Sequence, residues 1–367
     1  MQTVNEYAKT RALLTSHYHA YPALQAEDVF KLLFHSAFGC DHLVSDEQAA
    51  LRYIQSEYAS LPASAPACTE PLDGAYSRVH LGVLQEGLLP GTLARLFVLS
   101  ANPEPNGRAD LAQKLALAQD MIERGELPID PTDFAQKLDA WRAQGFPAVH
   151  HSEIFRKAYH PAYRVIANRY AELLPILTAI DKQLAHGSAT VAIEGGSASG
   201  KSTLANTLQQ IYNCTVLHTD DFFLRPEQRT PERLAEIGGN LDRERFADEI
   251  VPPLTHGEPI RYRRFDCMTQ TLVEPVTVQQ HALTVIEGAY SLHPYFGKYY
   301  DLAIFLDIDP DIQKKRIGVR NSPMLARRFF DEWIPMENAY FAAMDIKNRA
   351  DLIVPVGRED RLTSQNP

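Results

Sequence analysis

One eight-residue segment combines glycine, lysine and serine at the spacing that binds a chain of phosphates. It fits the pattern G-x-x-x-x-G-K-[ST], the Walker A or P-loop motif, at every fixed position: Gly195-Gly196-Ser197-Ala198-Ser199-Gly200-Lys201-Ser202. Its glycines let the backbone N–H groups turn inward around the phosphates. Lys201 can neutralise phosphate oxygens, Ser202 can place its hydroxyl on Mg²⁺, and Thr203 can reach the α-phosphate. The segment therefore predicts a site for ATP and Mg²⁺.

Such a loop must be held between a buried strand and a helix. Residues 189–194 are an apolar strand candidate, and residues 202–211 have a helical pattern, so the helix N-terminus adds a favourable partial positive charge. Four similar apolar runs follow, at residues 215–219, 283–286, 302–306 and 352–356. They lack polar alternation, which is typical of a parallel sheet covered on both faces. The alternation of strands and helices predicts a doubly wound α/β domain.

An acidic residue follows one of these strands and is a candidate metal ligand. Glu287 comes directly after the run 283–286, at the strand end where open α/β sheets place their sites. Asp307 and Asp309 follow the run 302–306 and are a competing acidic strand end. We rank Glu287 higher as the residue that holds Mg²⁺ together with Ser202. The alternative is an ordinary surface acid.

Two adjacent carboxylates, Asp220 and Asp221, end the second expected strand. Neighbouring carboxylates are costly unless a cation, a substrate proton or water serves them. A kinase that acts on an alcohol needs a carboxylate to orient the hydroxyl and accept its proton. We assign that role to Asp220, with Asp221 as a Mg²⁺ or substrate partner, although Asp221 could also be the base. A helix N-cap is the alternative reading of the pair.

Arginines follow the fourth expected strand at Arg316, Arg320, Arg327 and Arg328. Arg316 and Arg320 are four residues apart, so they share one helix face. Such a stretch can close over ATP and stabilise charge on the transferring phosphoryl group. A solvated basic helix face is the alternative.

Together these residues resemble the uridine kinase-like branch of the P-loop kinases, which also includes phosphoribulokinase and bacterial pantothenate kinase. The resemblance rests on the P-loop, on Asp220-Asp221-Phe222-Phe223, on Glu287-Gly288 and on the arginines from Arg316, and it spans about residues 188–356. It implies a five-stranded parallel sheet in the order 2-3-1-4-5. It also implies Asp220 as the base, Glu287 as the strand-end acid, and Arg316 and Arg320 as lid arginines.

The same resemblance implies an acceptor-binding region between the second and third strands. Tyr262, Arg264 and Phe265 could contact the acceptor there, and a surface hairpin is the alternative. The sequence has Asp-Asp-Phe-Phe where uridine kinases usually have Asp-Ser-Phe-Tyr. Uridine is therefore not implied as the acceptor, which could be a nucleoside or a related metabolite with an alcohol group.

Length and composition limit the other classes of function. The 367 residues suit two domains, and the hydrophobic content of 45% suits a folded, soluble protein. No apolar run is long enough to span a bilayer, and the scattered cysteines suggest free thiols, so we expect a cytoplasmic location without membrane partners. The net charge of −10 argues against nucleic acid as the main partner. The oligomeric state stays open, and a homodimer is compatible.

The first half reads as a mainly helical domain over residues 1–186, followed by the P-loop domain over residues 187–367. Residues 161–184 suggest a long closing helix, and residues 61–71 suggest a loop. Nine of the thirteen histidines lie at or before His186. A metal site or second catalytic site could use His42, His80, His151 and Glu153. Structural packing is the alternative, and Tyr159, Tyr163 and Arg164 could bind a small ligand or contact the second half.

Three functions remain compatible with these observations. The first is a small-molecule kinase that transfers the γ-phosphate of MgATP to an alcohol. The second is an ATP-dependent switch that regulates the N-terminal domain, although a switch has no need of a base such as Asp220. The third is a bifunctional enzyme with a second active site in the N-terminal half.

Overall fold

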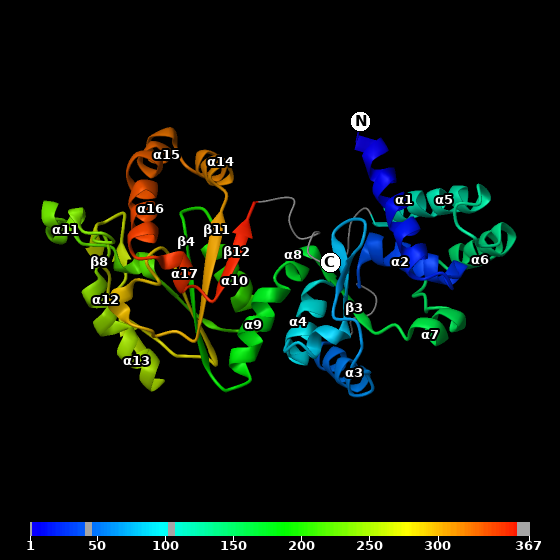
Figure 1. The fold of residues 1–367 in the computed structure, drawn as a ribbon, viewed down its shortest axis with the longest axis horizontal. Coiled ribbons are helices and arrows are strands. Elements are labelled where there is room, and N and C mark those ends of the chain that lie inside the picture. Colours follow the sequence, from blue (N-terminus) through cyan, green and yellow to red (C-terminus); the bar gives the residue numbers. More distant parts are fainter. Residues whose placement is uncertain (1, 41–45, 102–106, 358–367) are drawn as a thin grey trace. The chain divides into compact units, whose positions relative to one another are not determined.

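The computed structural model describes residues 2–40, 46–101 and 107–357 (Figure 1). The chain divides into two compact units, Met1–Thr178 and Ala179–Pro367. The division falls within helix α9 (Leu174–Leu184), a few residues before the boundary expected at residue 186. No helix in the described ranges has the length and apolar character needed to cross a membrane.

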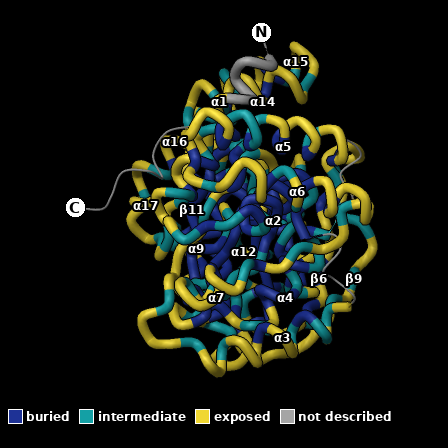
Figure 2. Tube along the Cα trace, turned by 90° about the vertical axis from the view of Figure 1, so that its right-hand side faces the viewer, coloured by how far each residue is buried: buried dark blue, intermediate teal, exposed yellow. Residues whose placement is uncertain are grey.

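The first unit is mainly helical and also contains a small antiparallel sheet. Its helices are α1 (Gln2–Ala20), α2 (Ala26–Phe38), α3 (Glu47–Ala59), α4 (Pro90–Leu99), α5 (Gly107–Glu123), α6 (Pro131–Ala143), α7 (Glu153–Tyr159) and α8 (Asn168–Ala171). Helix α2 has the largest buried face of these, and Figure 2 shows it mostly in the colour of buried residues, whereas α3 is largely exposed. Apolar residues at helical spacing on α2 therefore anchor this core.

The sheet of the first unit has the order β1-β2-β3 and corrects two expectations. Strand β1 (Thr69–Pro71) ends the segment expected to be a loop, and strand β3 (Tyr163–Ala167) lies in the segment expected to be a long helix. Strand β2 (Tyr76–His80) pairs with both. The segment Tyr163–Ala167 becomes a strand because β2, far away in sequence, supplies its hydrogen bonds, and such pairing overrides local helical periodicity.

The second unit contains the parallel sheet expected from the sequence. Its five strands lie in the order β12-β11-β4-β10-β5, with bounds Ala189–Gly195 (β4), Thr215–His218 (β5), Leu283–Glu287 (β10), Leu302–Ile308 (β11) and Leu352–Val356 (β12). Every neighbouring pair is parallel. Numbered along this unit, the order is 2-3-1-4-5, so the predicted P-loop fold with its strand order is confirmed.

Helices and short hairpins surround this sheet. The helices are α10 (Lys201–Tyr212), α11 (Pro231–Ala235), α12 (Arg243–Glu249), α13 (Val251–His256), α14 (Pro310–Arg320), α15 (Pro323–Arg328), α16 (Ile334–Ala343) and α17 (Ile346–Arg349). The hairpins pair β6 (Ile260–Tyr262) with β9 (Val276–Val278) and β7 (Phe265–Asp266) with β8 (Thr271–Leu272). A π-helical turn, Phe329–Trp333, joins α15 to α16.

Both faces of the parallel sheet are buried, as its uninterrupted apolar strands predict. Ala192 of β4 packs in one core cluster with Phe246 of α12 and Leu254 of α13. Its neighbours Val191 and Ile193, which point to the opposite face, are also fully buried. Figure 1 shows α10 and α12 on different sides of the strands. This double cover fixes the sheet, whose carboxyl edge carries the residues described next.

Candidate functional site

The phosphate loop joins β4 to α10 and depends on its glycines. Gly195 has φ +147°, and a Cβ there would lie 2.6 Å from the carbonyl oxygen of Leu306. Gly200 has φ +103° and is the N-cap of α10. Residues that carry a side chain rarely adopt these backbone angles, so the loop needs glycine at both positions. The result is a tight turn at a helix N-terminus, the arrangement that binds phosphates.

Polar groups of this loop fit a phosphate ligand. Lys201 Nζ donates hydrogen bonds to the carbonyl oxygens of Gly195 at 2.8 Å and Gly196 at 3.1 Å, so the ammonium is held over the loop. Ser199 Oγ is buried and has no hydrogen-bond partner in the described part of the chain. A buried hydroxyl without a partner is costly, and a phosphate oxygen would satisfy it.

Ser202 and Glu287 meet, as a shared metal site requires. Ser202 Oγ donates to Glu287 Oε1 at 2.9 Å, and Glu287 ends β10 beside β4. Burial disfavours the Glu287 carboxylate, but hydrogen bonds from His218 and Ser202 outweigh this effect and lower its pKa. The pair therefore offers an ionised carboxylate and a hydroxyl, which are the oxygen donors that Mg²⁺ prefers.

The competing acids have other roles. Asp307 pairs with Lys347, with 2.7 Å between Oδ2 and Nζ. Asp309 is the N-cap of α14, where its side chain accepts from the backbone of Asp311 and Ile312. Each is satisfied by its neighbours, so the structure favours Glu287 as the strand-end acid of the loop.

Asp220 and Asp221 lie in a short 3₁₀ turn, Thr219–Phe222, directly after β5. Water reaches the Asp220 side chain, yet the protein atoms packed around it raise its pKa above the ordinary value, with Glu287 and Asp221 adding repulsion and Lys201 opposing it. Desolvation also raises the pKa of Asp221, whose Oδ2 accepts from Tyr262 Oη at 3.1 Å. A water-accessible carboxylate with a raised pKa is suited to accept a proton.

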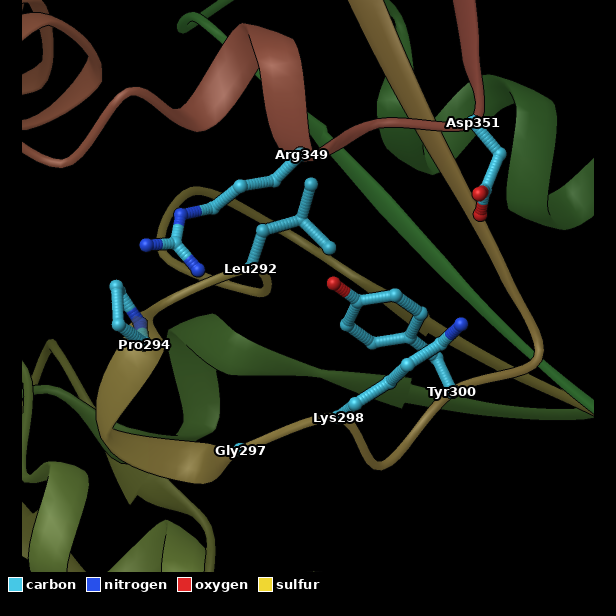
Figure 3. Close-up of a pocket in the computed structure, with 7 residues that line it drawn as sticks. All are labelled: Leu292, Pro294, Gly297, Lys298, Tyr300, Arg349 and Asp351. Atoms are coloured by element: carbon cyan, nitrogen blue, oxygen red, sulfur yellow. The ribbon is translucent and has the colours of Figure 1, made fainter.

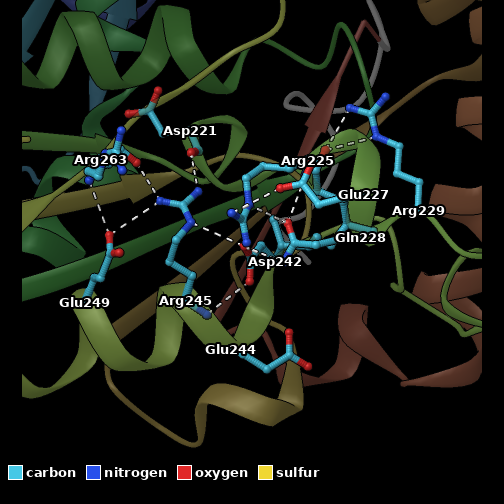
Figure 4. Close-up of polar contacts among 12 residues, drawn as sticks. Asp221, Arg225, Glu227, Gln228, Arg229, Asp242, Glu244, Arg245, Glu249 and Arg263 are labelled. Carbon is cyan, nitrogen blue, oxygen red and sulfur yellow. Dashed lines mark hydrogen bonds and ion pairs between the residues drawn. The ribbon is translucent and has the colours of Figure 1, made fainter. Parts of the chain in front are cut away.

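Arg245 of α12 holds this turn in place. Its Nη2 donates to the carbonyl oxygen of Asp221 at 2.7 Å, and its guanidinium carbon lies 4.2 Å from the centroid of the Phe222 ring. Figure 4 shows the same guanidinium between Asp221, Asp242 and Glu249. Arg245 was not singled out from the sequence, because its role depends on contacts between distant segments.

Three residues of α14 and α16 also contact the phosphate loop. Arg316 Nη1 donates to the carbonyl oxygens of Ala198 at 3.1 Å and Ser199 at 3.4 Å. Gln313 Nε2 donates to the carbonyl oxygen of Ser197 at 2.8 Å. Glu337, buried in α16, accepts from Ser197 through N at 2.8 Å and Oγ at 2.6 Å. The loop is therefore braced by α14 and α16.

The sequence predicted Arg316 but neither Gln313 nor Glu337. Arg320 lies exposed in the last turn of α14, and no contact with the phosphate loop is recorded for it within the described ranges. The spacing of Arg316 and Arg320 correctly placed both on α14. It could not show that only the first reaches the loop in this conformation.

Of the three expected acceptor residues, Tyr262 is closest to the acids. Its ring stacks on Phe222 with 5.6 Å between centroids. Phe265 is buried in β7, and its ring lies 5.7 Å from the guanidinium carbon of Arg229. Arg264 is exposed and lowers the pKa of Asp221 by its charge, against the larger effect of desolvation. These residues do lie in two hairpins, which the sequence left as the alternative reading.

A separate hollow of about 320 Å³ opens beyond β10 (Figure 3). It is lined by Leu292, Pro294, Gly297, Lys298, Tyr300, Arg349 and Asp351. None of these residues belongs to the phosphate loop or to its acids, and we assign the hollow no role.

The first unit gathers part of the second site suggested by its histidines. His80 and His151 both lie near the ring of Tyr163, with 5.9 Å and 5.8 Å between ring centroids. Glu153 instead pairs with Lys157 at the exposed start of α7, and His42 lies outside the described residues. The described residues contain no group of three or more side chains able to hold a metal ion.

The other expected ligand residues of this unit have partners within the unit. Tyr159 Oη accepts from the backbone N–H of Ala23 at 2.8 Å. Arg164 pairs with Glu57 at 2.8 Å. The hydroxyl of Tyr163 lies 2.6 Å from His151 Nε2, in a partly buried polar cluster.

As the pH falls, the first unit should lose stability at pH values well above those at which ordinary carboxylates are protonated. Burial and the charge of Arg78 lower the pKa of His17 to about 3, and burial lowers that of His151 to about 4. Below pH 6.5 the unfolded chain binds protons that these folded side chains do not. The unfolding free energy should therefore be highest above pH 6.5 and fall toward pH 4, by about 1.4 kcal/mol per pH unit for each histidine.

Urea unfolding at pH 7, 6 and 5 measures this effect. In a Trp333→Phe variant, fluorescence reports on Trp141 of the first unit, since the chain has two tryptophans. A further His151→Gln substitution should weaken the dependence of the unfolding free energy on pH, because one of the two buried histidines is removed. Substitution of the exposed His19 to Gln should leave this dependence unchanged. An unfolding free energy that is constant from pH 7 to pH 5 would contradict the buried neutral histidines.

No protein-family model and no curated protein matches the sequence. Several solved structures do match. A possible uridine kinase from Bacillus stearothermophilus shares 21% identity over 46% of this chain and 88% of its own, with a TM-score of 0.36. Shikimate kinase from Bacteroides thetaiotaomicron shares 14% identity over 47% of this chain and 90% of its own, with a TM-score of 0.26. The protein TT1252 from Thermus thermophilus shares 17% identity over 46% of this chain and 88% of its own, with a TM-score of 0.27.

The assignment of the fold itself rests on the strand order and the phosphate loop of this chain.

Proposed function

We propose that this protein transfers the γ-phosphate of ATP to an alcohol group of a small molecule. One observation carries the proposal. Ser202 and Glu287 are hydrogen-bonded to each other at the C-terminal edge of the sheet. Asp220 lies just beyond the adjacent strand, where the charge of Lys201 lowers its pKa and that of Glu287 raises it. Phosphate binding, metal binding and proton acceptance thereby meet at one edge of the sheet.

The phosphates would be held by the backbone N–H groups of residues 195–202, by Lys201 and by Thr203. Ser202 and Glu287 would hold Mg²⁺, with Asp221 as a further candidate ligand. When bound, the metal would neutralise negative charge on the phosphates. The unsatisfied Ser199 hydroxyl and the Ser202–Glu287 pair support this assignment of the ligands.

In the reaction Asp220 accepts the proton of the acceptor hydroxyl. The alcohol oxygen forms a bond to the γ-phosphorus, and the bond from that phosphorus to the oxygen bridging to ADP breaks. Negative charge on the transferring group is stabilised by Lys201 and Arg316. Arg320 could reach the phosphates if α14 moves when the site closes. Arg245 and Tyr262 keep the 3₁₀ turn of Asp220 in position throughout.

The acceptor would lie against the hairpins that follow Asp220. Tyr262, Arg264 and Phe265 come from these hairpins, and Tyr262 already contacts Asp221. An aromatic ring beside a guanidinium suits an acceptor with a planar or anionic part as well as its hydroxyl. A regulatory switch would need the phosphate loop and the metal ligands, but it would have no use for Asp220.

Glu287→Gln should reduce metal-dependent ATP turnover and raise the Mg²⁺ concentration needed for half-maximal rate by about tenfold or more, because the anionic ligand is lost. Asp307→Asn is the matched control, since it removes another strand-end acid, which pairs with Lys347 at the surface. Mg²⁺ titrations of ATP turnover compare the two. Equal Mg²⁺ dependence of both variants would contradict the role of Glu287.

A further inference from the structure

Arg78, in the middle of β2, is the most deeply buried charged side chain of the first unit that lacks full hydrogen bonding. The residue is 1% exposed. Its Nη1 lies 3.2 Å from His17 Nε2, and its guanidinium carbon lies 4.7 Å from the centroid of the Tyr163 ring. Nε and Nη2 are buried and have no hydrogen-bond partner among the residues that the structure describes.

The two unpaired nitrogens lie on the same edge of the guanidinium. Nε and Nη2 form the side of the planar fork that matches the two oxygens of a carboxylate or a phosphate. A buried cation with unpaired N–H groups is unfavourable, so natural proteins rarely leave such an edge without a partner. The ring of Tyr163 and the contact with His17 fix the fork in one orientation.

The nearby acids do not serve as that partner, because other groups bind them. Asp28 accepts from Ser152 Oγ at 2.7 Å and lies 2.7 Å from His151 Nδ1. Glu70 accepts from the Tyr21 hydroxyl and lies 3.0 Å from His80 Nε2. Both carboxylates therefore have other hydrogen-bond partners, and neither accepts from Nε or Nη2 of Arg78.

The charges and the solvent exposure of the residues around Arg78 limit the chemical class of the ligand. Two cations, Arg78 and Lys31, are balanced by the two carboxylates of Asp28 and Glu70, whose pKa values are both lowered. A doubly charged phosphate would meet repulsion from these carboxylates, whereas a carboxylate adds a single charge. Tyr21, Lys31, Glu70 and Tyr163 are half-buried, so solvent reaches the margin of the cluster.

We propose that Arg78 anchors a second ligand site, which binds the carboxylate group of a small molecule through Nε and Nη2. Tyr163 and His17 position the guanidinium, and the half-buried Tyr21 and Lys31 lie at the solvent-exposed margin of the cluster. This site belongs to the first unit alone and does not depend on phosphoryl transfer in the second.

NMR of the full-length protein with ¹⁵N-labelled arginine tests the site directly. The Nε–H signal of Arg78 would be assigned by its loss in Arg78→Lys and followed during titration with acetate, succinate and inorganic phosphate at constant ionic strength. The proposal expects a saturable shift with a carboxylate, at concentrations below about 0.1 M. No saturable shift with either carboxylate would overturn it, and a shift with phosphate alone would overturn the carboxylate class.

Hydrogen exchange gives a second readout. A binding carboxylate should slow amide exchange in β2 and β3 of the wild type and of Arg124→Lys, which changes an exposed arginine of the same unit. Arg78→Lys should abolish this slowing. Equal slowing in Arg78→Lys and Arg124→Lys would show that the anion binds elsewhere. If Arg78→Lys does not fold, the Nε–H signal of Arg78 is assigned in the wild type by its through-space contact with the Tyr163 ring. The wild-type titration, with chloride as the control, then still decides the proposal.

Discussion

Asp220→Asn should lower kcat for phosphoryl transfer by about 10²–10⁴-fold, because it removes the group that accepts the proton of the acceptor hydroxyl. The KM for ATP should change little, since Asp220 makes no hydrogen bond to the phosphate loop among those recorded. Steady-state ADP formation with a productive acceptor measures both constants.

The dependence on pH distinguishes Asp220 from its neighbour. The base acts only when it is deprotonated, so kcat/KM of the wild type should rise with pH through an apparent pKa above the ordinary aspartate value. Asp221→Asn is the matched control. It should retain this rising limb, because Asp221 is engaged by Tyr262 and its backbone by Arg245. If Asp220→Asn retained full activity, or if only Asp221→Asn lost the rise of kcat/KM with pH, Asp221 and not Asp220 would be the base.

Lys201→Ala should lower kcat/KM for ATP by about 10²–10³-fold, since it removes a preorganised cation from the position of the β- and γ-phosphates. Among the described residues, the hydrogen-bond partners of Lys201 Nζ are loop carbonyls, so the ammonium is available to exchange them for phosphate oxygens. Initial rates over a range of MgATP concentrations measure the loss.

Lys347→Ala is the appropriate comparison for Lys201→Ala. It removes a lysine of the same unit that pairs with Asp307 at the surface. Its activity and melting temperature should stay close to those of the wild type, because exposed ion pairs contribute little. Similar losses in both lysine variants would indicate a general effect on the fold and would contradict a specific role of Lys201.

The sequence predicted the second unit well because its chemistry is local. Gly195 and Gly200 are required by backbone angles that the loop alone sets, and Lys201 and Ser202 follow them at fixed spacing. Uninterrupted apolar strands indicated a parallel sheet covered on both faces, and both faces are indeed buried. The strand order came from the family resemblance and is confirmed by the pairing of β4 with β10 and β11.

Residues that act across the fold left no local signal. Glu337 lies 140 residues after Ser197 and yet accepts two of its hydrogen bonds. His218 lies in the apolar run expected at residues 215–219, and its Nδ1 lies 2.6 Å from Glu287 Oε1. A polar residue within an apolar strand was the available indication for His218. Glu337 offered none, since acids are common on helices.

The first unit was predicted least well for the same reason. Its sheet pairs β2 with β3, which begins 87 residues after the start of β2. The two strands are antiparallel, in the register Tyr76↔Ala167. Local periodicity in residues 161–184 therefore suggested a helix where β3 forms. Arg78 belongs to this sheet, and only its burial distinguishes it from a surface arginine.

The most direct test of the proposed function is ADP release from MgATP with a panel of alcohols, comparing the wild type with Lys201→Ala. The panel should include nucleosides, sugar derivatives, hydroxy acids and vitamin precursors. The proposal predicts strong stimulation by at least one acceptor and its loss in Lys201→Ala. ATP binding without stimulation by any acceptor, and with a slow basal turnover that Asp220→Asn leaves unchanged, would contradict a kinase and favour a nucleotide-dependent switch.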